Sequence, residues 1–256
     1  AGGTYAVTNL GDEPQQPPAR PVAATVAVHN QRYTNIPFVV QNAQYVRVSG
    51  LGDPAIERRV NQLLRAPLDE AIEYVRSSTS GTGGDCTQTA RLSSTAQIGL
   101  RTPSLISAVY THEAELCAPA DGRLPGRAVT VDLRTGRVLG PEDVFKPAMF
   151  TTSALNSLWG RMNSRLEYSL SASRCNDFEL ERRDFLQANQ GGAPSGLRQP
   201  AATVFLAPDG FEINWAVIGS ACEYDRMHAP YSSVRDMLKP ELLARIPAAG
   251  PSPQRS

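Results

Sequence analysis

The sequence predicts an α+β fold: an antiparallel sheet built of hairpins, with two or three helices packed on it and disulfides that staple it. Strand-like runs are separated by turn-forming residues, helical periodicity is confined to a few segments, and the four cysteines include no CxxC pair. At 256 residues and 41% hydrophobic content, the chain can bury a core of its own.

Both ends of the chain differ in composition from its middle. Residues 1–32 contain a polar, proline-rich run and are predicted to form a disordered tether, and residues 247–256 are predicted to form a disordered tail. The remaining span, 33–246, is then expected to form a single α+β domain.

The first predicted elements are a strand and a helix. Residues 38–48 begin apolar and then alternate, as a half-buried strand does. Asp53 and Pro54 supply an N-cap and a first-turn proline for a helix over residues 54–77. Pro67 either kinks this helix or splits it in two.

Hairpins are predicted through the middle of the chain. Residues 87–100 and 105–116 form two arms around a proline-containing break, and residues 128–133 and 138–139 flank a tight turn. The C-terminal elements are a helix over 147–169, a polar loop to 199, hairpin strands over 203–206 and 211–217 around Pro208-Asp209-Gly210, and a short closing helix from Pro230.

The cysteine positions predict two disulfides. Cys86 and Cys117 lie symmetrically about position 101.5, inside the proline-containing break, so a hairpin that turns there places them opposite each other. Cys175 is left to pair with Cys222. Structural disulfides imply an oxidising compartment, so the chain is expected to be secreted or anchored to the cell envelope.

Charge and motifs argue against several classes of function. Lys plus Arg and Asp plus Glu both number 25, so no attraction to nucleic acid is expected. The three histidines lack metal-site spacing, and the sequence has no GxSxG, Walker A or GxGxxG motif. No metal and no cofactor is therefore predicted.

Three segments together resemble a known family. They are the run from Val109 through Ala128-Val129-Thr130-Val131-Asp132-Leu133-Arg134-Thr135-Gly136-Arg137 to Phe145, the hairpin Phe205 to Ile213, and Ala229-Pro230-Tyr231 leading into the last helix. Their order and spacing resemble the RsiV-type extracytoplasmic C-terminal domain of a lysozyme-sensing anti-sigma factor. Related domains occur in secreted mycobacterial immunogenic proteins and beside polysaccharide deacetylase domains.

The resemblance implies a non-catalytic domain tied to the envelope or to secretion. Its partner would be a protein or a cell-wall glycan, and a membrane anchor could precede the segment seen here. One departure concerns Cys117 to Gly122, where family members often carry a Gly-Gly-Ala-His-Pro-like run. A ligand role for that histidine does not carry over to this chain.

The segment between Cys222 and Tyr231 is the candidate binding site. It joins the last strand to the last helix and concentrates side chains typical of interface hot spots. The candidates are Glu223, Tyr224, Asp225, Arg226, His228 and Tyr231. Tyr224→Ala and Arg226→Ala are expected to weaken a partner without unfolding the domain. The alternative is that Met227 and Tyr231 simply pack under the terminal helix.

Two other functions stay open. Glu113 and Glu115 share one face of a predicted strand, and Glu223 and Asp225 flank Tyr224, so either pair has the spacing for a cell-wall glycan hydrolase. Exposed acidic residues on strands are more often only solvated. The third possibility is a structural accessory domain with no ligand.

Overall fold

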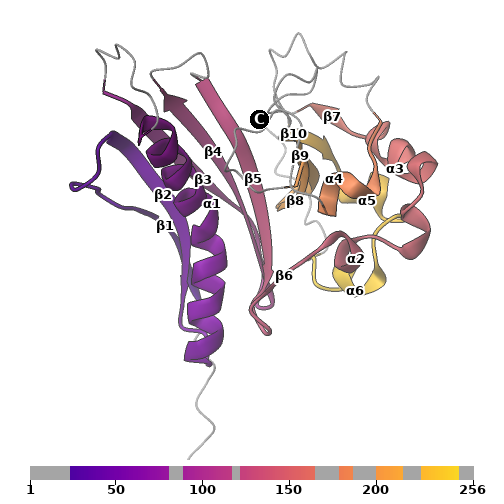
Figure 1. Ribbon diagram of the computed structural model, residues 1–256. Coiled ribbons are helices and arrows are strands. Elements are labelled where there is room, and N and C mark those ends of the chain that lie inside the picture. Colours follow the sequence, from indigo (N-terminus) through magenta and orange to yellow (C-terminus); the bar gives the residue numbers. More distant parts are fainter. Residues whose placement is uncertain are drawn as a thin grey trace, which may run out of the picture.

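The computed structural model describes residues 24–80, 89–116, 122–164, 179–186, 200–215 and 226–247. Two sheets form its framework (Figure 1). A long helix lies along one face of the larger sheet, and the smaller sheet, with its short helices, lies on the other side. The α+β class predicted from the sequence is therefore confirmed.

The larger sheet has six strands in sequence order: β1 (Thr25–Asn30), β2 (Val39–Ser49), β3 (Arg91–Arg101), β4 (Leu105–Glu115), β5 (Gly122–Asp132) and β6 (Arg137–Val138). The smaller sheet has the order β7-β10-β9-β8, with β7 (Asn163–Ser164), β8 (Ala202–Ala207), β9 (Gly210–Trp215) and β10 (Arg226–Ala229). The helices are α1 (Pro54–Ser80), α2 (Pro141–Val144), the 3₁₀ helix η1 (Pro147–Met149), α3 (Thr152–Trp159), α4 (Arg182–Leu186), α5 (Tyr231–Val234) and α6 (Pro240–Leu243).

The prediction of a single antiparallel sheet is wrong in two respects. There are two sheets, and β2 pairs with β3 in parallel, because the chain crosses over through α1 between them. The described helices also exceed the predicted two or three. The expected helix over 147–169 instead comprises η1 and α3, which starts where Thr151 accepts a hydrogen bond from Ala154 N and ends before Gly160.

The predicted tether is wrong at its C-terminal end. Residues Thr25–Asn30 form β1, which pairs antiparallel with β2 along its whole length, from Thr25 opposite Ser49 to Asn30 opposite Gln44. The folded domain thus begins before residue 33. Residues 1–23 and 248–256 lie outside the described residues.

Helix α1 begins as the sequence predicts and runs through Pro67 without interruption. Asp53 Oδ1 accepts hydrogen bonds from the amides of Ala55 (2.7 Å) and Ile56 (3.2 Å), which caps the first turn. The buried Tyr110 hydroxyl, on β4, donates to the carbonyl of Leu64 in α1 and accepts from Val46 N on β2. This one side chain links the helix to two strands. No described helix is both long and apolar enough to cross a membrane.

The hairpin of β3 and β4 is centred slightly beyond the predicted point. Gln97 pairs with Val109, so the centre of the hairpin falls at Pro103 and not at 101.5. All four cysteines, and hence both predicted disulfides, lie outside the described residues.

Strand β4 is covered on both faces over its first half. Ile106, Ala108 and Tyr110 point toward α1, whereas Val109 packs with Phe205 of β8. The two sheets approach each other closely at Gly99, where an added Cβ would lie 2.3 Å from the carbonyl oxygen of Leu206 and 2.4 Å from the Phe205 ring. A side chain at position 99 would therefore push the sheets apart.

We expect Gly99→Ala to destabilise the domain by about 2 kcal/mol or more, because overpacking against backbone cannot be relieved by rotating a side chain. Gly52→Ala is the matched control, since a Cβ there meets nothing within 4 Å, and it should change the free energy of unfolding by less than about 0.5 kcal/mol. Denaturant titration of both variants measures the difference. Equal stability of the two variants would contradict the close approach of the sheets.

A second prediction concerns His112, which is buried on the α1 side of β4, directly opposite Ser94. Burial lowers its pKa from 6.5 to about 4. The unfolded chain therefore binds this proton between pH 6.5 and 4 and the folded chain does not. The free energy of unfolding should fall as the pH drops through that window, by about 3 kcal/mol at most from this residue.

Stability of His112→Leu, measured from pH 7 to pH 4, should lack this part of the slope. His29→Leu is the control, because His29 lies exposed on β1. If His112→Leu and the unmodified chain have the same slope, His112 is not the residue that titrates.

Candidate functional site

Strand β10 presents two of the predicted site residues toward the larger sheet. Met227 and Ala229 are buried in the core between the smaller sheet and its helices. Because strand side chains alternate, Arg226 and His228 point the other way, into the seam between the sheets. Both are only partly exposed, at 23% and 18% of their side chains.

Glu212 supplies the negative charge in this seam. It lies on β9, directly opposite His228, and is completely buried. Its Oε2 accepts hydrogen bonds from Arg226 Nε (2.8 Å) and lies 2.6 Å from Arg226 Nη2. A buried carboxylate is tolerated when it is paired in this way.

Arg226 also joins the two sheets. Its Nη1 donates to Gln97 Oε1 on β3 (2.8 Å), and its guanidinium carbon lies 4.9 Å from the centre of the Phe205 ring on β8. A cation held over an aromatic face gains electrostatic attraction in addition to the ion pair. One side chain from β10 thus contacts β9, β8 and β3.

His228 completes the cluster on the other side of Glu212. Its Nε2 lies 3.7 Å from Asp209 Oδ1, in the turn between β8 and β9. Gly210 makes this approach possible, because a Cβ there would lie 2.3 Å from His228 Nε2 and 2.4 Å from the carbonyl oxygen of Ala229. We call Gln97, Asp209, Glu212, Arg226 and His228 the inter-sheet site.

Tyr231 lies beside this site and has a structural role. Its hydroxyl donates to the carbonyl of Ala207 (2.9 Å), which ties the start of α5 to the end of β8. Burial raises the pKa of Tyr231, and the charges of Asp209 and Glu212 raise it further. The hydroxyl therefore stays protonated and keeps this hydrogen bond.

Three residues of the cluster have the chemistry to hold a metal ion. Ligand atoms of Asp209, Glu212 and His228 all lie within 4.8 Å of one another. Glu212 is already bonded to the Arg226 guanidinium, so a metal would share this carboxylate with a neighbouring positive charge. The sequence analysis predicted no metal and did not single out Asp209 or Glu212.

A polar strip on the larger sheet continues from the inter-sheet site. On β3 and β4, Thr95 lies opposite Thr111, Ser93 opposite Glu113 and Arg91 opposite Glu115, on the same face as Gln97. Thr95, Thr111 and Glu113 are exposed. We call these six residues the polar strip.

The carboxylates proposed for hydrolysis fall in this strip. Glu113 and Glu115 are both exposed, and Glu115 lies 3.8 Å from Arg91. A glycosidase acid is usually held in a partly apolar pocket that keeps it protonated, and the surface of β4 does not provide one for either residue. Glu223 and Asp225, the other pair of carboxylates proposed for hydrolysis, lie outside the described residues.

The structure thus brings Arg226, His228 and Tyr231 together. Tyr224, the remaining predicted site residue, also lies outside the described part of the chain. The sequence analysis missed Gln97, Asp209 and Glu212. Glu212 alternates with apolar residues in Phe211-Glu212-Ile213, a pattern that indicates a solvent-facing side chain when only one face of a strand is covered.

The sequence matches no family model and no curated protein. Solved structures with a similar fold include two proteins of one family. A member of the DUF3298 family from Bacteroides fragilis aligns with a TM-score of 0.52 and 12% identity, over 88% of this chain and 98% of that chain. A DUF3298 family protein from Pseudomonas aeruginosa aligns with a TM-score of 0.46 and 15% identity, over 87% and 97% of the two chains. This chain therefore shares its fold with a member of DUF3298, a family of domains of unknown function.

Proposed function

We propose that this chain is a non-catalytic binding module of the cell envelope, of the RsiV type, that holds a protein partner along the inter-sheet site and the polar strip. The observation that carries the proposal is the Arg226 network. The Arg226 guanidinium is held in place by Glu212, Gln97 and Phe205. It lies next to the polar strip, an exposed strand face that carries hydroxyl and charged side chains.

Rigidity is the first argument for this surface. The side chains that border it are held by ion pairs and strand pairing, so presenting them to a partner costs little conformational entropy. Arg226 keeps part of its side chain exposed at the seam. Arginine is one of the residue types that are enriched at energetically important interface positions.

The composition of the surface favours a protein over a glycan. The six residues of the polar strip and the five of the inter-sheet site include no Tyr, Trp or Phe, the side chains whose rings stack on sugars. Flat strands with alternating hydroxyl, acidic and basic groups suit a protein surface of complementary charge. A wall glycan is the alternative partner.

The resemblance to RsiV-type domains supports the envelope setting. The three segments that carry it correspond to the second half of β4 through α2, to the β8–β9 hairpin and to the end of β10 through α5. Two of the three border the inter-sheet site. The DUF3298 likeness supports the fold and leaves the function open.

The test uses the full chain to capture a partner from envelope extract, followed by affinity measurements with variants. Arg226→Ala alone is unsuitable, contrary to the expectation from sequence, because it removes the guanidinium that is paired with the buried Glu212 carboxylate, a change that costs about 3–5 kcal/mol. The double variant Arg226→Gln/Glu212→Gln removes both charges together. We expect this variant and the surface variant Glu113→Lys each to weaken the partner by about tenfold or more.

Arg58→Glu is the control, because Arg58 is exposed on α1, on the opposite face of the larger sheet. It should leave the affinity unchanged, and all variants should keep the circular dichroism spectrum of the unmodified chain. Equal losses in the control and the site variants, or no loss in either site variant, would place the binding surface elsewhere. Turnover of a wall glycan that Glu113→Gln or Glu115→Gln abolishes would instead support the hydrolase.

A further inference from the structure

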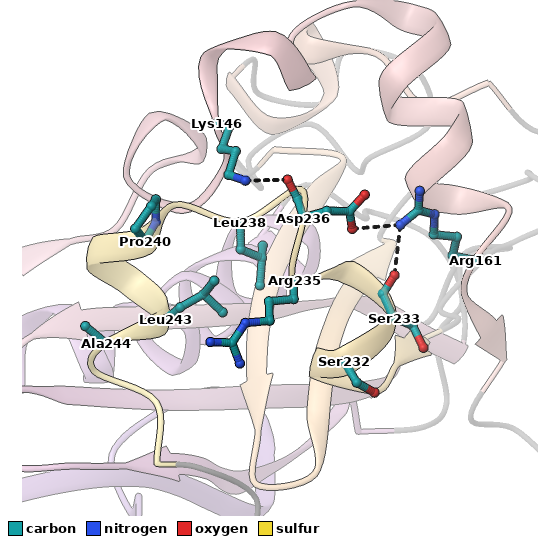
Figure 2. A pocket seen from close by; sticks show the side chains of 10 residues that line it. All are labelled: Lys146, Arg161, Ser232, Ser233, Arg235, Asp236, Leu238, Pro240, Leu243 and Ala244. Carbon is teal, nitrogen blue, oxygen red and sulfur yellow. Dashed lines mark hydrogen bonds and ion pairs between the residues drawn. The ribbon is translucent and has the colours of Figure 1, made fainter.

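A pocket of about 770 Å³ lies among the short helices beside the smaller sheet (Figure 2). Its lining comes from the segments that follow α2 and α3, from α5 and the residues after it, and from α6. Its volume is within the range of small-molecule sites. Backbone hydrogen bonds hold the segment after α2 against the segment before α6 at this pocket. Lys146 N donates to the carbonyl of Met237, and Lys239 N donates to the carbonyl of Val144. None of its lining residues belongs to the inter-sheet site.

The lining is strongly basic. Lys146, Arg161 and Arg235 line it together with a single acidic residue, Asp236. Arg161 Nη1 donates to Asp236 Oδ1 (2.8 Å) and to the carbonyl of Ser233 (3.0 Å), and Lys146 Nζ donates to the carbonyl of Asp236 (2.7 Å). One positive charge is matched by Asp236, and two remain.

Arg235 provides the donors that the pocket leaves unused. In Figure 2, Lys146 and Arg161 point toward Asp236, whereas the Arg235 guanidinium extends away from it, toward Leu243 and Ala244. Within the described part of the chain the Arg235 guanidinium makes no hydrogen bond or ion pair, and the Arg161 guanidinium uses only Nη1. A guanidinium offers a planar pair of donors that fits a carboxylate or a phosphate.

The same pocket has an apolar side. Leu238 is fully buried beneath it, and Leu243, Pro240 and Ala244 contribute carbon surface beside Arg235. An inorganic anion would contact only the basic groups, and the apolar side of the pocket would stay exposed to water. A ligand that carries both an anionic head and a short apolar body would use both sides.

We propose that this pocket binds a small amphiphilic anion, with its carboxylate or phosphate head on Arg235 and its apolar body on Pro240, Leu243 and Ala244. The site is separate from the proposed partner surface and does not depend on it. The chemistry shared by carboxylate and phosphate is the doubly accepting anionic head. Which of the two is preferred is an outcome of the test.

The test is isothermal titration of the full chain with four probes: hexanoate, hexyl phosphate, hexanol and inorganic phosphate. Probes of this size should bind with dissociation constants in the millimolar range. We expect hexanoate or hexyl phosphate to bind at least tenfold more tightly than hexanol, which lacks the charge, and than inorganic phosphate, which lacks the body. Binding of inorganic phosphate as tightly as hexyl phosphate would overturn the amphiphilic ligand.

Two variants locate the ligand. Arg235→Gln should weaken the better probe by about tenfold, and Ala244→Glu, an exposed position, should abolish its binding by placing a carboxylate where the apolar body lies. Arg58→Gln, on α1, is the control and should leave binding unchanged. The proposal is wrong if neither anionic amphiphile binds saturably, if hexanol binds as well as they do, or if Arg235→Gln has no more effect than the control.

Discussion

The buried carboxylate of Glu212 is the constraint on which the meeting of the two sheets depends. A charge with no exposed surface must be compensated by fixed partners, and among the described residues Arg226 is such a partner. Arg226, on β10, is itself hydrogen-bonded to Gln97 on β3, so the ion pair that compensates Glu212 on β9 also connects the smaller sheet to the larger one. The orientation of the smaller sheet on the larger one is specified by this polar network as well as by the packing of Phe205 against Val109.

Much of the fold follows from local chemistry. The start of α1 at Asp53 and Pro54, the hairpin at Pro208-Asp209-Gly210 and the turn before β6 are all set by residues adjacent in sequence, and the structure contains each of them. In that turn, Asp132 Oδ1 accepts hydrogen bonds from the amides of Arg134 and Thr135, and Gly136 adopts a positive φ of 63°. Turn residues carry this information because their conformations depend on few neighbours.

The division into two sheets depends on contacts between distant segments. A signal was nevertheless present in β4, where Leu105 to Tyr110 is apolar at nearly every position and buried throughout. Such a run indicates a strand covered on both faces. The alternation of polar and apolar residues in β9 is misleading for the same reason: Glu212 and Asn214 lie on the face that the larger sheet covers, and Asn214 Nδ2 donates to the carbonyl of Gly126 there. The candidate site residues Arg226 and His228 were found for their chemistry, but their buried acidic partner could not be distinguished from a solvated residue.

The parallel pairing of β2 with β3 has a consequence for the order in which the chain folds. Val39 pairs with Arg91 only after α1 has closed the crossover between them, whereas β3, β4 and β5 are joined by antiparallel pairing between neighbours in sequence. Closing the longer loop between β2 and β3 costs more chain entropy, and this cost arises before the strand pairing can stabilise the chain. The three-stranded meander can therefore form as an early nucleus, and the N-terminal hairpin of β1 and β2 joins it late, as the helix docks and Tyr110 gains its two backbone partners.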